Sequence, residues 1–349
     1  MASSASAAQD HGNAFNALRM LAASAVIFSH HFHIIRVQPP AWLHSDMVGG
    51  VAVMTFFTIS GYLVTLSWLR DPRIWAFVVK RLLRLWPGML VAVAADMLLF
   101  GPVFTSLPLR EFWANPNTLD HLRNLLLVKA YTDMPGVFAN NPLAGLMNGP
   151  LWTIPMEVMC YAALAGVAVL GVLRWRWLAT LAAVGYLCFF VLLRNADLTG
   201  TMRHWFEYPA YFAFGALIAL HRDAFARKGA WVVLVLLPVA AGLFWGVELQ
   251  HTAGLLWLPP LLIWLGSWRA AFFARLQRWG DPSYGIYLLG CPIQQAVYDL
   301  WPGLPFGPSL ALALALSVLA GYASWHAVES PALGLKRWLA PGQGRFVYP

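Results

Sequence analysis

The stretch RMLAASAVIFSHHFH, residues 19–33, decides how this chain folds. It starts with Arg19, continues without a charged residue, and then carries three histidines within four positions, His30, His31 and His33. The apolar part predicts a helix in lipid, because lipid offers no partners for exposed backbone N–H and C=O groups. The ionisable groups at its two ends need a separate explanation.

The composition of the whole chain is that of a membrane protein. Of its 349 residues, 60% are hydrophobic and 11% are charged, whereas an ordinary soluble domain carries about 25% charged residues. The mean hydropathy is +0.62. A membrane-spanning helix needs about 20 apolar residues, so we expect an all-α polytopic integral membrane bundle of about ten transmembrane helices. We place these helices at residues 14–35, 49–69, 86–104, 150–173, 177–194, 205–221, 229–247, 252–269, 282–300 and 308–328.

The basic residues predict the orientation of this bundle. With a cytoplasmic N-terminus, 17 of the 23 Lys and Arg residues fall on the cytoplasmic side, as the positive-inside rule favours. We therefore expect both termini in the cytoplasm, with tails at residues 1–13 and 331–349 around one transmembrane domain at 14–330. The pI near 9.6 then needs no nucleic-acid partner, since basic loops that meet anionic lipid headgroups account for it.

The three cysteines, Cys160, Cys188 and Cys291, each lie inside an apolar stretch. Their spacing is not that of a metal site. We interpret them as packing residues and predict no metal.

Arg19 and His30 are eleven residues apart, so in a helix they lie about 16 Å apart along the axis and leave the same face. Histidine is suited to proton transfer near neutral pH, and ionisable groups inside a membrane are candidates for function. The alternative is that the histidines only approach the outer headgroups while Arg19 anchors the helix at the interface. If one histidine is a base, the helical phase favours His30, because His31 points about 100° away.

A second candidate is KRLLRLWP, residues 80–87, which we place at the start of the predicted helix 86–104. Arg81 and Arg84 share a helix face, and guanidinium groups match phosphate oxygens. With Arg19 they would form a cationic pocket. The alternative is that they follow the positive-inside rule alone.

A third candidate is Glu157 in NGPLWTIPMEVMCYA, residues 148–162, about two turns inside the fourth predicted helix. A carboxylate at this depth is costly and points to a role in or beside a site. It would orient a histidine, accept a proton or pair with an arginine. In FFTISGYLV, residues 56–64, we expect Ser60 and Gly61 to allow close helix packing, and we do not assign Ser60 as a nucleophile.

In chain order, these fragments resemble motifs of the acyltransferase-3 family of membrane acyltransferases, especially its polysaccharide O-acetyltransferase members. The matching fragments are NALR with Arg19 and His30, FFTISGYL, KRLLRLWP, PLWTIPMEVMCY, SYGIYLLGCP and VESP. They run from residue 16 to residue 331.

The chain departs from the family pattern in three places. Asn16 stands where the family has Asp, and Ala52 and Met54 replace a Gly and an Asp. Gly290 stands where the family has a histidine, which would leave more of the proton transfer to His30 or His31.

The resemblance implies transfer of an acyl group, acetyl foremost, from acetyl-CoA to a sugar hydroxyl of a surface polysaccharide or lipid-linked glycan in the bacterial inner membrane. Arg19, Arg81 and Arg84 would hold the CoA phosphates, His30 would take the proton of the acceptor hydroxyl, and Glu157 would hold His30 in its basic form. The covalent route through an acyl-histidine stays open beside direct transfer. The alternative function is a proton-coupled transporter or flippase of a lipid-linked sugar, which predicts two similar halves; the sequence shows no such symmetry.

Overall fold

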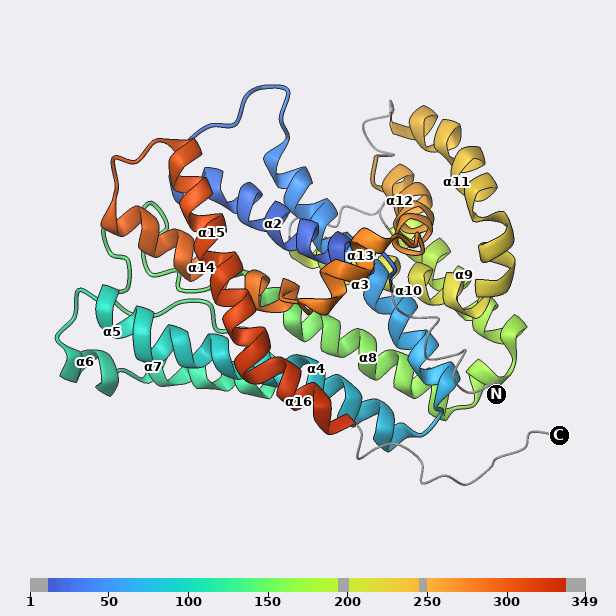
Figure 1. Cartoon of the computed structure of the whole chain (residues 1–349), viewed down its shortest axis with the longest axis horizontal. Coiled ribbons are helices and arrows are strands. Elements are labelled where there is room, and N and C mark those ends of the chain that lie inside the picture. The colour runs from blue at the N-terminus through green and yellow to red at the C-terminus, as the bar shows by residue number, and fades with distance from the viewer. Residues whose placement is uncertain (1–11, 194–200, 245–249, 337–349) are drawn as a thin grey trace.

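A computed structural model of the chain describes residues 12–193, 201–244 and 250–336. Within these ranges the chain is helical with three isolated β-bridges, which confirms the all-α class (Figure 1). The elements are α2 (Phe15–Ile34), α3 (Ser45–Arg70), α4 (Ile74–Ala95), η1 (Asp96–Phe100), α5 (Gly101–Phe104), α6 (Leu109–Ala114), α7 (Pro116–Asp120), η2 (His121–Leu126), η3 (Gly149–Thr153), α8 (Ile154–Val169), η4 (Val172–Arg174), α9 (Arg176–Leu193), α10 (Thr201–Leu220), α11 (Arg222–Phe244), α12 (Gln250–Gly266), α13 (Ala271–Arg278), α14 (Ser283–Leu300), α15 (Phe306–Ser324), η5 (Trp325–Glu329) and α16 (Ser330–Gly334).

A helix overlaps each predicted transmembrane segment. Length and composition qualify five helical stretches to cross a membrane, and two shorter apolar helices accompany them. The five are Ser45–Arg70, Ile74–Phe104, Gly149–Val169, Arg222–Leu243 and Phe306–Gly334. The chain is thus an integral membrane protein by its helices, while the number of crossings and the side of the termini stay predictions. Residue 194 and residues 245–247 of the predicted helices lie outside the described residues.

Small residues let α3 and α10 pack closely, as the FFTISGYLV stretch predicts. A Cβ atom on Gly61 would lie 2.0 Å from the carbonyl oxygen of Phe212, and one on Gly215 would lie 2.2 Å from that of Thr58. The two helices can come this near only because residues 61 and 215 are both glycines. On its other sides α3 packs against α2, which in turn packs against α14.

The start of α4 corrects one prediction. The sequence places KRLLRLWP at the beginning of a helix, but α4 begins at Ile74, so these residues lie inside it together with Pro87. A proline inside a helix removes one backbone hydrogen bond, and this loss is tolerated here because the earlier turns are held by packing. Phe77 is buried and its ring lies 5.6 Å from that of Trp68 on α3. The arginines of this stretch therefore project from a continuous helix wall.

At the other end of α4, a π-helical turn presents the carboxylate of Asp96. This carboxylate is fully buried and lies 3.1 Å from Nε2 of His121 and 2.9 Å from the amide nitrogen of Asn148. The contacts fix the segment between α5 and η3 against the bundle.

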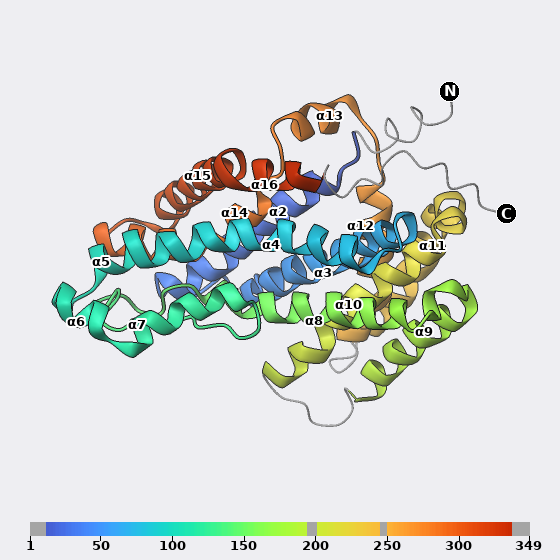
Figure 2. The ribbon, with the colours of Figure 1, turned by 90° about the horizontal axis from the view of Figure 1, so that it is seen from below.

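One end of the bundle, which we call the basic end, gathers chain segments that are far apart in sequence. The start of α2, the end of α3, the start of α4 and the start of α14 meet there. The segment after α15 also returns to this end, where α16 packs on α4 (Figure 2).

Candidate active site

A cavity of about 610 Å³ lies at the basic end between α2, α3, α4, α8, α14 and the segment after α15. Among the described residues, six cationic side chains and three carboxylates line it. The cations are Arg19, Arg70, Lys80, Arg81, Arg84 and Lys336, and the carboxylates are Asp71, Glu157 and Asp281. The cavity therefore carries an excess of positive charge.

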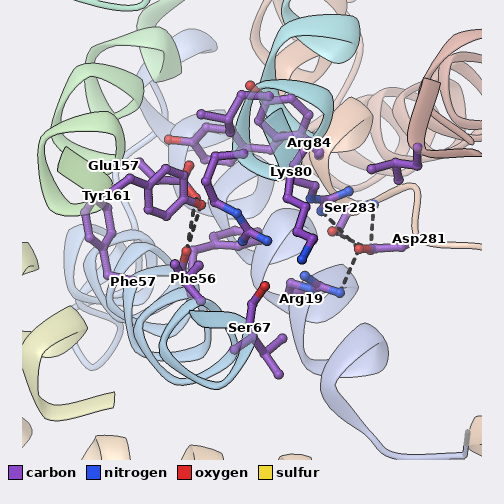
Figure 3. A pocket seen from close by; sticks show the side chains of 18 of the residues that line it. Arg19, Phe56, Phe57, Ser67, Lys80, Arg84, Glu157, Tyr161, Asp281 and Ser283 are labelled. Atoms are coloured by element: carbon purple, nitrogen blue, oxygen red, sulfur yellow. Dashed lines mark hydrogen bonds and ion pairs between the residues drawn. The ribbon is translucent and has the colours of Figure 1, made fainter. Parts of the chain in front are cut away.

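Asp281, in the loop before α14, organises one wall of this cavity. Its carboxylate lies 2.8 Å from the Arg19 guanidinium and 3.0 Å from that of Arg84, and it accepts a 2.6 Å hydrogen bond from Ser283. Burial raises the pKa of Asp281, but the charges of the two arginines outweigh it and hold this pKa below its ordinary value. The ionised carboxylate thus fixes both guanidinium groups (Figure 3).

Arg81 is held differently from its neighbour Arg84. Its guanidinium carbon lies 5.8 Å from the ring centre of Tyr161 and 5.9 Å from that of Phe77, within the range of cation–π contacts. Among the described residues no carboxylate forms an ion pair with Arg81, and its Nε atom has no hydrogen-bond partner. Its charge is therefore available to a ligand.

Glu157 lies on the opposite side of the cavity from Asp281 (Figure 3). Its carboxylate accepts hydrogen bonds from the hydroxyl of Tyr161 and, at 3.2 Å, from that of Ser60. The two hydroxyl oxygens are 2.9 Å apart. The structure therefore brings Glu157 together with the three predicted arginines, and its hydrogen bonds come from hydroxyl groups rather than from a histidine.

His30 does not line the cavity. The neighbouring Ser29 packs against Gly49 of α3, where an added Cβ would lie 2.5 Å from the serine oxygen. Gly49 is one helical turn, about 6 Å, from Val53, which lines the cavity. His30 thus lies about one helical turn beyond the end of the cavity that Val53 lines. The predicted contact between His30 and Glu157 is not formed.

His31 is fully buried, and its Nδ1 atom lies 3.0 Å from the side-chain nitrogen of Gln294. One turn earlier on α14, a Cβ on Gly290 would lie 2.7 Å from the Ile27 side chain. Ile27 therefore fills the space that the family's histidine would need. Gln294 also donates a 2.8 Å hydrogen bond to the backbone of Ile27.

Sequence reasoning missed several residues of the cavity. Tyr161 follows Glu157 by four positions, and this spacing predicts neighbours on one helix face, so a signal was present. Asp281 lies two residues before the fragment SYGIYLLGCP, and the sequence patterns do not single it out as a site residue. Lys336 lies in the predicted C-terminal tail, although α16 crosses the predicted boundary at residue 330.

Together these features define an integral membrane protein with a cation-rich cavity inside a helical bundle. Such a cavity suits a ligand with several negative charges at one end, since arginine groups bind phosphate oxygens in pairs.

Comparison with known proteins places the chain in a family. The family model of the acyltransferase-3 acyltransferase domain matches residues 13–326, so the chain belongs to this family. It is 28% identical over 338 residues to a protein of Shigella phage Sf6 named O-acetyl transferase, covering 91% of this chain and 95% of that one. It is 27% identical over 363 residues to Nodulation protein 10 of Rhizobium leguminosarum bv. viciae, covering 93% and 94%. No solved structure matches.

The predicted resemblance is thereby confirmed, and the protein is an acyltransferase of the membrane. None of these matches supports the alternative of a transporter or flippase.

Proposed function

We propose that this acyltransferase moves an acyl group, acetyl foremost, from acyl-CoA to a hydroxyl of a sugar in a surface polysaccharide, lipid-linked glycan or related acceptor. We further propose that it does so in the bacterial inner membrane, with the basic end facing the cytoplasm, where acyl-CoA is found. The relative named O-acetyl transferase supports acetyl as the transferred group.

The observation that carries the proposal is the distribution of charge in the cavity. CoA carries phosphates at one end and a thioester on a long uncharged arm at the other. Among the described residues the cavity has six cationic side chains against three carboxylates. Its lining on α3 extends from Arg70 to Val53, about 26 Å along the helix axis. Arg81, which forms no ion pair among the described residues, would bind phosphate together with Arg19 and Arg84.

The far part of the cavity suits the uncharged arm. Its wall there is formed by Val53, Phe56 and Phe57 of α3, with Thr153 and Tyr287 facing them from other helices. The volume of about 610 Å³ falls within the range of small-molecule sites, about 300–1,000 Å³. The thioester at the tip of the arm would then approach the level of His30.

In the proposed reaction the oxygen of the acceptor hydroxyl attacks the thioester carbonyl carbon, and the carbon–sulfur bond breaks. His30 takes the hydroxyl proton and returns it to the departing CoA thiolate. Glu157 is the second group proposed to handle this proton, since its carboxylate faces the cavity through which the arm passes. An acyl-enzyme that survives acid quench and disappears in His30→Ala would establish the covalent route in place of direct transfer.

The test uses membranes that contain the protein, labelled acetyl-CoA and a glycan acceptor. Label is expected to move from acetyl-CoA to the glycan as an alkali-labile ester. Membranes without the protein are the control. If label stays on CoA with every glycan that the host assembles at its surface, the proposed donor and acceptor are wrong.

A further inference from the structure

The segment after α15 forms part of the cavity wall. A π-helical turn, η5, redirects the chain, and α16 then packs on α4. Glu329 of this turn is 1% exposed, accepts a 2.7 Å hydrogen bond from Ser324 and lies 4.0 Å from the Arg84 guanidinium. Beyond α16, Lys336 reaches the cavity that holds the arginines. The segment that leads into the predicted tail is thus anchored to α4 by the buried carboxylate of Glu329.

Two sets of charged and titratable groups accompany Lys336: those that line the same cavity and those on the η5 turn before it. The first set is Arg19 on α2, Arg70 and the adjoining Asp71 at the end of α3, Lys80, Arg81 and Arg84 on α4, Glu157 and Tyr161 on α8, Asp281 before α14, and Tyr284 and Tyr287 on α14. The second set is His326 and Glu329.

Each carboxylate in these sets already has other partners. Asp71 pairs with Lys80 at 2.6 Å, and Asp281 pairs with two arginines. Glu157 accepts its hydrogen bonds from hydroxyl groups, and Glu329 accepts one from Ser324. Within the described part of the chain no carboxylate forms an ion pair with Lys336. Its ammonium group therefore faces a cationic cavity without a counter-charge of its own.

We propose that Lys336 is a phosphate-binding residue of the acyl-donor cavity and that the segment after α15 completes this site. The inference rests on the proposed function for the identity of the donor. A phosphate group placed between Arg81 and Lys336 supplies the negative charge that both side chains lack.

Donor binding is then coupled to a proton. Burial, together with the charges of Arg81 and Arg84, lowers the pKa of Lys336 to about 8. A bound phosphate stabilises the charged ammonium and raises this pKa again. Donor affinity is therefore full below about pH 8 and falls as the pH rises above it, because the free site must take up a proton to bind.

The test compares Lys336→Met, which removes the charge, with Lys336→Arg, which keeps it at every pH used. The KM for acetyl-CoA and kcat are measured from pH 7.5 to 9.5. For the wild type the KM is expected to rise about tenfold over this range. Lys336→Met is expected to have a raised KM already at pH 7.5 with no further rise, and Lys336→Arg a low KM throughout. The matched control is Lys228→Met, which changes an exposed lysine of α11 outside the cavity.

Equilibrium binding of ADP at pH 7.5 separates this inference from the proposed function, because ADP carries a diphosphate without an acyl group. Weaker ADP binding in Lys336→Met supports the phosphate site even if acetyl-CoA proves not to be the donor. Unchanged ADP binding and an unchanged acetyl-CoA KM in Lys336→Met overturn the inference, and so does a wild type that does not bind ADP.

Discussion

Arg81 and Arg84 lie one helical turn apart on α4, yet they hold their charges in different ways. Arg84 pairs with Asp281 and lies near Glu329, so its removal leaves Asp281 with Arg19 alone and Glu329 without its guanidinium neighbour. Removing one partner of a buried ion pair is destabilising because it leaves buried charge less compensated. Arg81 has aromatic neighbours instead, so its removal breaks no ion pair among the described residues.

This contrast predicts that substitution of Arg81 affects mainly donor binding, whereas substitution of Arg84 also affects stability. Arg81→Met is expected to raise the KM for acetyl-CoA about tenfold, since one charge-assisted hydrogen bond is lost, while the thermal midpoint of the protein stays within a degree or two of the wild type. Arg84→Met is expected to lower the thermal midpoint clearly. Donor KM and thermal unfolding in detergent measure both effects. An Arg81→Met protein with an unaltered donor KM would remove the phosphate role.

His30 and Glu157 are the two groups proposed to handle the proton of the acceptor. Their positions differ, since Glu157 lines the cavity and His30 lies about one turn beyond it. His30→Gln and Glu157→Gln are each expected to lower kcat by about 100-fold or more, with the donor KM of His30→Gln unchanged because the phosphates bind elsewhere. The larger loss identifies the base. Normal turnover of both variants at unchanged expression contradicts the assignment.

At this scale the sequence predicts which residues share the cavity better than it predicts how they contact one another. Spacing and motif order point to Arg19, Arg81, Arg84 and Glu157, and the structure brings these four together in one cavity. The contact of Glu157 with hydroxyl groups depends on how α8 is rotated against α3. That rotation is set by tertiary packing, so no local pattern reports it.

Gly290 of α14 lies directly against Ile27 of α2, so the pair leaves no room for a larger side chain at residue 290. Since a Cβ at residue 290 would lie 2.7 Å from Ile27, Gly290→His is expected to lower the thermal midpoint and the yield of folded protein. Ile27→Ala is expected to recover part of the loss in the double variant, because the two residues share one space and their effects are not additive. A Gly290→His protein as stable as the wild type would contradict this packing.

The turn between α3 and α4 is tied by Asp71, and it makes stability depend on pH. The hydrogen bond from Arg73 and that from Lys80 lower the pKa of Asp71 to about 2, against burial, which raises it. Because the pKa of Asp71 is lower in the folded state than in the unfolded state, its ionised carboxylate stabilises the folded protein. This stabilisation is fully present above about pH 4 and is lost as the pH falls toward 2.

Asp71→Asn is therefore expected to lower the thermal midpoint at pH 7, and this difference is expected to shrink as the pH falls from 4 to 3. Thermal unfolding of both proteins across pH 3–7 checks it. The effect is at most about 2 kcal/mol and is smaller in practice, since the side chain is 19% exposed. A difference that is the same at every pH would show that the asparagine acts through packing rather than charge.

At the scale of elements, hydropathy predicts where helices lie, and a helix overlaps every predicted segment. It fails at the start of α4, because Pro87 and the basic residues before it are typical of a helix beginning. The first turns of α4 make side-chain contacts such as that of Phe77 with Trp68 of α3, which hydropathy does not contain. Most of α16 falls in the predicted tail for the same reason, because its packing on α4 is not visible in hydropathy.

For the whole molecule, the bundle brings residues of five of the six motifs into one cavity at the basic end. The chain segments that line it extend from Asn16 to Lys336, so no short window of sequence contains the site. The resemblance of motifs in order predicts the family, and the match over residues 13–326 confirms it. The excess positive charge of the cavity emerges only when these segments are placed together.

The most direct measurement of the central claim is a structure of the protein with bound acetyl-CoA. We expect the phosphates within about 3 Å of the Arg81 guanidinium, with Arg19 and Arg84 beside them and the thioester extending along α3 toward the level of His30. Acetyl-CoA bound outside the cavity, or bound with its phosphates at the end lined by Val53, would contradict the proposed binding mode.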